Sequence, residues 1–336
     1  MKVLENISLK PYNTFGINAL ANSLISVKSE AELRNVLREY PQQHKMILGG
    51  GSNILFTQKR ITNLLIKNDI QGISVVKEWK NHVWVAAGGG VIWHDFVLWC
   101  IKNDYGGVEN LSLIPGTVGA APIQNIGAYG VELKDIFLKL SAIHLLTKKQ
   151  KTFYANDCKF GYRESIFKHA EKGKYCITKV YFKLTKIPHR THIEYGAIRQ
   201  YLGNNIAPSI TDVSNAVIAI RQSKLPDPRK IGNAGSFFKN PEISQKKYAL
   251  LRKQFIEMPS YPTSATTVKI PAGWLIEQCG WKGIRHGDVG CHAQQALVLV
   301  NYGEASGQDI LQLAHQIQDS VLKTFGIQLH TEVNII

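Results

Sequence analysis

Apolar residues recur at helical spacing in some parts of the chain and at strand spacing in others, so the pattern predicts a mixed protein of helices and sheets. Near the N-terminus, Leu33, Val36 and Leu37 form one apolar stripe. Ser29 and Glu32 have the spacing of a capping box, which is typical of the start of a helix. The segment therefore predicts a helix that begins after Ser29.

A second helix is predicted over residues 306–326. Ser306 and Asp309 again have capping-box spacing, and Gly326 follows the last apolar position as a C-terminal cap. Its apolar stripe consists of Ile310, Leu313, Ala314, Ile317, Val321 and Leu322. Such a stripe favours packing of one helix face against a core.

Short apolar runs and alternating runs predict strands at residues 45–48, 83–87 and 175–184. In the third run, apolar residues alternate with lysines, which is typical of a half-buried strand with a solvated basic face. Residues 327–335 alternate as well and predict a terminal strand with Glu332 on its polar side. A solvent-exposed edge strand would give the same pattern.

A long segment with little regular pattern, residues 105–130, is apolar and poor in charge. Such a segment is not typical of disorder, so we expect its backbone to lie against a bound ligand. Two glycine clusters, residues 49–51 and 88–90, each follow a predicted strand. Neither has the dinucleotide fingerprint of a Rossmann fold. Successive N–H groups in such turns still form concavities that bind anions, and a pyrophosphate fits this expectation.

Residues 232–241 read Gly-Asn-Ala-Gly-Ser-Phe-Phe-Lys-Asn-Pro and place Ser236 between a flexible Ala-Gly step and two aromatic residues. The segment is not the G-x-S-x-G elbow of acyl hydrolases. Phe237 and Phe238 would form apolar walls that exclude water from a site at Ser236. A tight structural turn has the same composition, so this segment alone leaves both interpretations open. Two prolines within residues 223–228 separate it from the preceding region.

Composition narrows the class of protein. The 336 residues carry a net charge of +15, which favours anionic partners, although no nucleic-acid-binding motif accompanies the charge. No apolar run approaches the roughly 20 residues of a membrane span, and the N-terminus lacks a signal-peptide core. The 5 cysteines contain no C-x-x-C pair, so we expect no metal, no disulfide framework and a reduced compartment. His286, Cys291 and His292 match no standard metal spacing and are interpreted as structural.

Six segments, in order along nearly the whole chain, together resemble the UDP-N-acetylenolpyruvoylglucosamine reductase family, flavoenzymes that complete UDP-N-acetylmuramic acid for peptidoglycan. The segments are residues 13–16, 48–55, 114–125, 161–165, 232–241 and 272–277. Six ordered matches are far more specific than any single glycine motif. Tyr195 resembles the substrate-closing tyrosine of the first type of this family.

The resemblance implies an α+β protein, with a two-subdomain FAD-binding fold of the vanillyl-alcohol-oxidase type followed by an α+β substrate-binding domain. The expected boundaries are 1–70 and 71–222 for the FAD-binding subdomains (with the whole FAD-binding domain at about 17–188), 223–325 for the substrate-binding domain and 326–336 for a strand that returns to the FAD-binding domain. A cytoplasmic monomer is expected, with a UDP-sugar as its small-molecule partner and without nucleic acid or membrane.

The resemblance also implies a reaction: NADPH reduces UDP-N-acetylglucosamine enolpyruvate through non-covalent FAD, and the two substrates take turns in one pocket. The catalytic positions of the family fall on Arg163, Ser236 and Glu332. Negative charge develops beside the enolpyruvyl carboxylate as hydride arrives, and the Arg163 fork can stabilise it. Glu332, if protonated or sharing a proton, stabilises the same enolate by hydrogen bonding, and Ser236 delivers the proton to carbon.

Further positions are assigned to ligands by the same resemblance. Tyr195, Lys224 and Asn240 match residues that hold the nucleotide diphosphate. The positions that match the flavin-binding backbone are Gly49, Gly50, Gly51, Ser52, Asn53, Ile114, Pro115, Gly116, Gly119, Ala120, Gln124, Asn125, Gly127 and Ala128. One position departs from the family: Asn334 stands where many relatives carry an arginine, so any flavin contact by that arginine is in question.

Two alternatives remain open at this level. One is another FAD-dependent oxidoreductase of the same fold, such as a sugar oxidase. Many of these enzymes tether the flavin through histidine, and no histidine occurs in residues 49–53 or 114–130. The other is a basic nucleic-acid-binding protein without a redox role, whose RNA affinity would fall steeply with salt.

Overall fold

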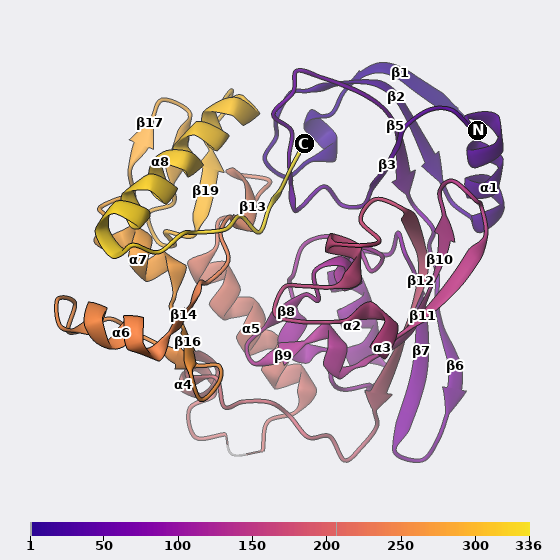
Figure 1. Ribbon diagram of the computed structural model, residues 1–336. Helices are drawn as coiled ribbons and strands as arrows, with labels where there is room; N and C mark the ends of the chain where they lie inside the picture. The colour runs from indigo at the N-terminus through magenta and orange to yellow at the C-terminus, as the bar shows by residue number, and fades with distance from the viewer. Residues whose placement is uncertain (1, 206) are drawn as a thin grey trace. The chain divides into compact units, whose positions relative to one another are not determined.

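The structure, a computed structural model that describes residues 2–205 and 207–336, divides into two compact units (Figure 1). The first unit contains residues up to Ile7, Ala21–Gly51 and Ile61–Ser223, and the second contains Ser8–Leu20, Ser52–Arg60 and Lys224–Ile336. Each unit is thus built from segments that are far apart in the sequence. The domain boundaries expected from the sequence remain a prediction.

The first sheet of the first unit has the strand order β1-β2-β5-β3, and β3 runs parallel to β5. Its strands are β1 (Val3–Ser8), β2 (Leu20–Val27), β5 (Arg60–Asn68) and β3 (Lys45–Leu48). Helix α1 (Glu30–Glu39) confirms the first predicted helix, because Ser29 Oγ accepts a hydrogen bond from the Glu32 N–H at 3.1 Å. Its buried residues Leu33 and Val36 pack with Leu64 of β5.

The second sheet of this unit is antiparallel throughout, with the order β11-β10-β12-β7-β6. Its strands are β11 (Gln150–Tyr154), β10 (Phe137–His144), β12 (Tyr175–Thr185), β7 (His82–Gly88) and β6 (Ile73–Glu78). Strand β12 confirms the alternating run, with buried apolar residues and exposed lysines. Helix α2 (Trp93–Lys102) packs on it, since the rings of Trp93 and Phe96 lie 5.9 and 4.5 Å from that of Phe182.

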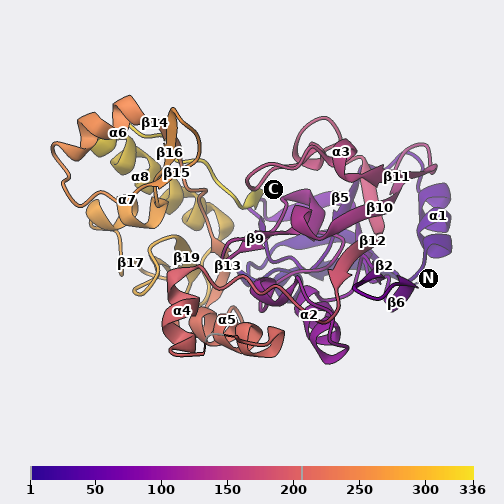
Figure 2. The ribbon, with the colours of Figure 1, turned by 90° about the horizontal axis from the view of Figure 1, so that it is seen from below.

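Short elements complete the first unit. They are the 3₁₀ helices η2 (Glu109–Leu111), η3 (Ala121–Ile123), η4 (Leu133–Asp135) and η5 (Ile166–Lys168), the hairpin of β8 (Gly127–Ala128) and β9 (Val131–Glu132), and helix α3 (Ala155–Cys158). The segment at residues 105–130 is therefore mostly irregular, as predicted. Helices α4 (Gly196–Leu202) and α5 (Ile210–Lys224) pack together through a cluster that contains Ile198 and Val213 (Figure 2).

The second unit contains, among its described residues, the sheets β13-β19-β18-β17 and β14-β16-β15 and the parallel pair β20-β4. Its strands are β13 (Gly232–Ser236), β19 (Val298–Asn301), β18 (Val289–Cys291), β17 (Arg285–His286), β14 (Glu242–Ser244), β16 (Thr267–Lys269), β15 (Tyr261–Pro262), β20 (Asn334–Ile335) and β4 (Ile54–Leu55). Its helices are η1 (Lys10–Tyr12), α6 (Gln245–Arg252), α7 (Ala272–Gln278) and α8 (Gly307–Phe325).

Helix α8 confirms the second predicted helix and its caps. Ser306 Oγ accepts the Asp309 N–H at 3.2 Å, and the Asp309 carboxylate accepts the Ser306 N–H at 2.8 Å. At the other end, Gly326 has a left-handed backbone with φ of 62°. The hydrogen bond from Ser306 lowers the pKa of Asp309, so this cap stays ionised at neutral pH.

The predicted terminal strand over residues 327–335 is wrong in extent. Only β20, Asn334–Ile335, is a strand, and Thr331 makes an isolated bridge to Phe238. The alternation itself is real, because Ile327, Leu329 and Val333 are buried. The backbone of this segment bonds to several different partners instead of one continuous neighbouring strand, and alternation cannot distinguish these cases.

The membrane prediction can be compared with the helices directly. Within residues 2–205 and 207–336, the structure has no helix with both the length and the apolar character required to cross a membrane.

A stability prediction follows from the first residue of α8. A Cβ at Gly307 would lie 1.7 Å from the Phe56 carbonyl oxygen, a backbone atom that cannot rotate away. We expect Gly307→Ala to destabilise the protein by about 1–3 kcal/mol or more, although alanine is the better helix former. Thermal unfolding followed by circular dichroism measures this. The matched control is Gly196→Ala at the start of α4, where no atom lies within 4 Å of the new Cβ; equal midpoints for the two variants would contradict the expectation.

Candidate active site

Two predicted flavin-binding segments meet in the first unit. A Cβ at Gly50 would lie 2.9 Å from Gly116 Cα, and a Cβ at Gly49 would lie 2.8 Å from Thr117 Oγ1. Both distances are too short for a real side chain, so the backbone after β3 approaches the 116–120 loop as closely as glycine permits. Gly51 continues this turn with φ of 64°. The contact fixes the shape of this glycine turn, and a fixed turn of successive glycines suits a cofactor that carries a pyrophosphate.

The loop is fastened to the start of α2. The Trp93 N–H donates to the Gly116 carbonyl at 3.0 Å, and Val118 N–H donates to the Val91 carbonyl at 2.9 Å. The buried Trp93 indole also donates to the Leu111 carbonyl at 2.9 Å. These bonds fix the backbone on both sides of Ile114.

The second glycine cluster, residues 88–90, is not an anion site. The N–H groups of Gly88, Gly89 and Gly90 donate to the carbonyls of Gly72, Thr178 and Ile70 at 2.8–2.9 Å. A Cβ on Gly89 would lie 2.2 Å from the Ile177 carbonyl oxygen. These glycines are therefore required for close packing between strands, which corrects the prediction that both clusters form anion-binding concavities.

Arg163 lies in a tight turn between Gly161 and Glu164, which exchange two backbone hydrogen bonds of 3.0 and 3.1 Å. Its backbone is left-handed, with φ of 54°, and its guanidinium lies 5.3 Å from the Tyr162 ring centroid. Nη2 donates to the Gly127 carbonyl, so the guanidinium is oriented by the loop of predicted flavin contacts. A Cβ at Gly127 would lie 2.9 Å from the Val131 carbonyl oxygen, a backbone atom, which explains a glycine there.

Asn125 ties the same loop to the Arg163 turn. Its side-chain amide donates to the Gly161 carbonyl at 2.9 Å and to Glu132 at 3.0 Å, and its Oδ1 accepts the Lys134 N–H at 3.0 Å. The residue is fully buried. Its side chain thus acts within the protein, and a flavin contact at this position would have to come from backbone atoms.

Tyr195, at the start of α4, is 51% exposed and packs edge-on against Tyr129 at 5.2 Å between ring centroids. Asn110, buried in the adjacent η2, donates to the carbonyls of Tyr129 at 3.0 Å and His192 at 2.8 Å. Burial raises the pKa of Tyr129, opposed by Arg221 and reinforced by Tyr195, so this hydroxyl stays protonated at neutral pH. The segment of residues 192–195 is therefore anchored in the first unit.

In the second unit, Ser236 ends β13 and pairs with Val298 of β19 after a bulge that begins at Asn233. The bulge is held by Asn233, whose Oδ1 accepts the Gly235 N–H at 2.9 Å and whose amide donates to the Ile231 carbonyl at 2.8 Å. Gly235 has φ of 71°, a conformation that favours glycine. A bulge re-aims the side chain that follows it, and here that side chain is half-buried Ser236.

Glu332 lies on the chain segment beside Ser236. Its N–H donates to the carbonyl of Phe237 at 2.8 Å, and the adjacent residues Phe238 and Thr331 form a bridge. The side chains of Phe237 and Phe238 are fully buried, and the Phe237 ring contacts that of Phe15 edge-on at 6.2 Å. Glu332 is half-buried. The structure thus brings two predicted catalytic residues together across adjacent backbone.

Asn53 and Asn334 form a second connection to this segment. The Asn53 amide donates to the Glu332 carbonyl at 3.2 Å, while the Asn334 amide and N–H each donate to the Asn53 carbonyl at 3.0 Å. Asn334, the residue that departs from the family pattern, therefore fixes the backbone on the C-terminal side of Glu332.

The remaining predicted positions of the second unit are less constrained. Lys224 is exposed at the end of α5, which leaves its ammonium group accessible to an anionic ligand. Asn240 is half-buried, and its Oδ1 accepts the Ala272 N–H at the start of α7 at 2.9 Å. Ser52 is also half-buried.

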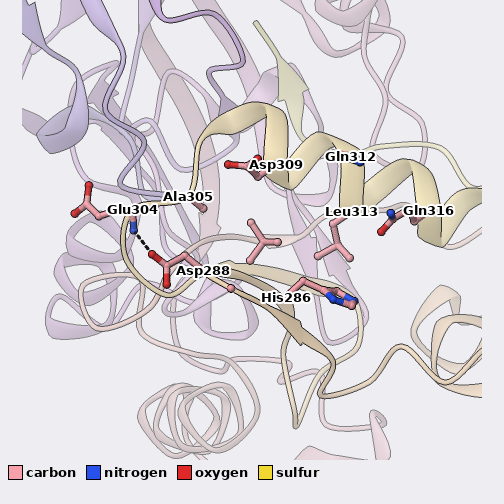
Figure 3. Close-up of a pocket in the computed structure, with 10 residues that line it drawn as sticks. His286, Asp288, Glu304, Ala305, Asp309, Gln312, Leu313 and Gln316 are labelled. Atoms are coloured by element: carbon pink, nitrogen blue, oxygen red, sulfur yellow. Dashed lines mark hydrogen bonds between the residues drawn. The ribbon is translucent and has the colours of Figure 1, made fainter.

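A cavity of about 610 Å³ in the second unit contains none of the predicted site residues (Figure 3). It lies between the β17–β18 hairpin and α8, and Asp288, Glu304 and Asp309 line it. Asp288 accepts the Glu304 N–H at 2.9 Å, and Asp309 caps α8. Carboxylates would repel a nucleotide diphosphate, so this cavity is not the candidate active site.

The cysteines fit the structural interpretation of the sequence. Cys291 is buried, its thiol donates to the Ala296 carbonyl at 3.1 Å, and burial raises its pKa to about 12. Burial likewise raises the pKa of Cys158 and of Cys176 to about 12. Within the described ranges, no group of three His, Cys, Asp or Glu side chains is arranged to hold a metal ion.

The sequence did not indicate several residues that fix the backbone near the predicted site positions. Trp93, Asn110 and Asn233 fix three separate backbone segments, each through hydrogen bonds to carbonyl or N–H groups. A buried asparagine or tryptophan has no local pattern that reveals its partner. Asn110 and Asn233 do lie in segments that the sequence analysis singled out, residues 105–130 and 232–241, but nothing there indicated their partners.

Comparisons with known proteins relate the whole chain to one enzyme family. Residues 227–336 match the family profile of the UDP-N-acetylenolpyruvoylglucosamine reductase C-terminal domain, and residues 21–148 match that of an FAD binding domain. The chain is 54% identical over 338 residues to the UDP-N-acetylenolpyruvoylglucosamine reductase of Flavobacterium johnsoniae, with 100% of both chains covered. It is 44% identical over 339 residues to that of Pseudomonas aeruginosa, with 100% of this chain and 99% of the relative covered.

The fold is similar as well. The crystal structure of UDP-N-acetylenolpyruvylglucosamine reductase from Thermus caldophilus superposes with a TM-score of 0.70 at 24% identity, covering 100% of this chain and 99% of that chain. The identity over the full length of the curated relatives decides the family. The chain belongs to the UDP-N-acetylenolpyruvoylglucosamine reductase family.

Proposed function

We propose that this protein reduces UDP-N-acetylglucosamine enolpyruvate to UDP-N-acetylmuramate, a precursor of peptidoglycan, with FAD as its cofactor and NADPH as co-substrate. Family membership and the FAD-binding profile support the reaction class. The observation that carries the proposal is the bond from the Glu332 N–H to the Phe237 carbonyl, because it pairs the backbone of Glu332 with that of the serine segment.

The residues of the first unit fit the cofactor. Gly49 and Gly50 pack directly against the 116–120 loop, and the Trp93 N–H holds that loop through the Gly116 carbonyl. When bound, FAD supplies the hydride chemistry of the reduction. The protein supplies position and electric field, and the following roles belong to its own side chains.

Arg163 binds the carboxylate of the enolpyruvyl group. A planar guanidinium matches a carboxylate with two parallel donors, and its fixed positive charge stabilises the negative charge that develops there. The bond from Nη2 to the Gly127 carbonyl orients this guanidinium. A lysine would keep the charge but not this geometry.

Ser236 and Glu332 act on the enolpyruvyl carbon that adjoins the carboxylate. Ser236 donates a proton to the carbon that carries the developing charge, and the protonated carboxyl of Glu332 donates a hydrogen bond to the enolate. Serine is a weak acid in water, so geometry must compensate. The bulge at Asn233 and the backbone bond of Glu332 to Phe237 support such a geometry.

Tyr195, Lys224 and Asn240 hold the UDP group of the substrate. Lys224 is exposed and cationic, which suits a diphosphate, and Tyr195 presents a half-exposed ring at the start of α4. The net charge of +15 also favours an anionic substrate. A single chain is proposed as the catalytic unit.

The serine assignment is tested by separating the two half-reactions. Because proton donation to carbon belongs only to the second, Ser236→Ala should leave the rate of flavin reduction by NADPH nearly unchanged. Reoxidation by the enolpyruvyl substrate should slow by roughly a hundredfold or more. Anaerobic stopped-flow absorbance follows both. Ser320→Ala on α8 is the control, and equal slowing of both half-reactions in the Ser236 variant would refute the assignment.

Glu332 provides an independent test of the same site. If it stabilises developing charge, Glu332→Ala should keep the fold and the flavin spectrum while turnover falls by roughly a hundredfold or more. If it is only a surface residue, the change should be nearly silent. Steady-state turnover distinguishes these cases, with Glu277→Ala as control because its ion pair with Lys282 at 2.7 Å is exposed. Normal turnover of the Glu332 variant would remove this residue from the mechanism.

A further inference from the structure

Leu113 immediately precedes the flavin-binding loop, and its backbone is left-handed. Its φ is 58°, a value that residues with a Cβ rarely adopt. Ile114, Pro115 and Gly116 follow directly and belong to the predicted flavin contacts. A residue in such a conformation persists only when its surroundings hold it there.

Two side chains from different helices hold Leu113 by both of its backbone polar groups. The Leu113 N–H donates to Nδ1 of His94 on α2 at 3.0 Å. Nε of Arg221 on α5 donates to the Leu113 carbonyl at 3.2 Å. The preceding residue is fixed to α5 as well, because the hydroxyls of Ser112 and Ser214 lie 2.8 Å apart.

Only the neutral form of His94 can accept the hydrogen bond from the Leu113 N–H. A ring nitrogen accepts a hydrogen bond when it is unprotonated, and both ring nitrogens become donors in the imidazolium. Protonation would therefore replace the acceptor at Nδ1 with an N–H that faces the Leu113 N–H. It would also place a second positive charge beside Arg221.

We propose that His94 is a positioning residue for the flavin-binding loop: the neutral imidazole keeps Leu113 in its left-handed conformation, and protonation releases the loop and weakens FAD binding. This inference rests on the proposed flavin role of residues 114–128. His94 acts through Leu113 and does not itself touch the cofactor.

The surroundings of His94 set the pH range of this effect. Burial lowers the pKa of His94 below its ordinary value of 6.5; Asp95 on α2 opposes this shift, and Arg221 on α5 reinforces it. Burial also lowers the pKa of Arg221; Tyr129 opposes this shift and Arg163 reinforces it. Between pH 6.5 and the lower folded-state pKa, the unfolded chain binds a proton that the folded chain does not. The stabilising contribution is therefore complete above pH 6.5 and is lost as the pH falls through the folded-state pKa.

The test uses FAD affinity and a measurement that needs no cofactor. Flavin fluorescence titrations from pH 5 to 8 should show the affinity of the unmodified protein falling in acid, by up to about tenfold per pH unit below the folded-state pKa. His94→Asn places an amide oxygen near the position of Nδ1 and cannot titrate. It should bind FAD nearly as well at neutral pH and lose the acid dependence attributed to His94. His94→Ala should bind about fivefold to tenfold more weakly across the range.

The matched control is His144→Asn. Nδ1 of His144 also accepts backbone N–H groups, from Leu146 and Thr147 at 3.1 Å, but in the turn between β10 and β11. This variant should retain the acid dependence of the unmodified protein. Hydrogen exchange of the FAD-free protein should show the protection factor of the Leu113 amide falling at acid pH, and not in His94→Asn.

Two results would overturn the inference. If His94→Asn keeps the same acid dependence of FAD affinity as the unmodified protein, His94 is not the titrating group. If the protection of the Leu113 amide does not change with pH, protonation does not release the loop. Loss of Leu113 protection in acid with unchanged FAD affinity would instead show that residues 114–128 do not bind flavin, so that the proposed function of the loop fails while the hydrogen bond to His94 stands.

Discussion

The close approach of two backbone segments, at Gly49–Gly50 and at Gly116–Thr117, is the constraint on which the first unit depends. No Cβ fits at Gly50, because Gly116 Cα would lie 2.9 Å from it. The approach requires the 116–120 loop to stay in place without regular secondary structure. Trp93 provides that restraint through the Gly116 and Leu111 carbonyls, so a helix that packs on the second sheet also determines the shape of the loop.

The proposed catalytic residues of the second unit depend on backbone hydrogen bonds in the same way. Ser236 is directed by a bulge that Asn233 stabilises, and Glu332 is placed by the bond of its N–H to Phe237. The fully buried ring of Phe237 prevents this segment from shifting. Asn334 then anchors the far side of Glu332 to Asn53. In both units, the segments that carry the proposed site residues are held largely by hydrogen bonds of the main chain.

Much of this could be predicted from the sequence where the signal is local. The capping residues Ser29 and Ser306 predicted two helices, and the alternation predicted strand β12; the structure confirms all three elements. Six segments predicted the family, which the comparisons confirm. Predictions failed where the partner lies far away in the chain. The glycines at 88–90 looked like the cluster at 49–51, yet they pack against Ile70 and Thr178 instead of leaving N–H groups for an anion. The contacts of His94 had no local signal at all.

The most direct measurement of the central claim is the affinity of Gly50→Ala for FAD. Neither Gly50 nor the control position Gly161 has a positive φ, and a Cβ at Gly161 would meet Glu164 Cβ at an ordinary 3.5 Å. Fluorescence titration of variants that retain native circular dichroism should show FAD binding weakened by at least about tenfold in Gly50→Ala, the scale of one overpacked contact. Gly161→Ala should bind FAD normally. Native FAD affinity in a correctly folded Gly50→Ala protein would contradict the claim that this backbone approach forms the flavin site.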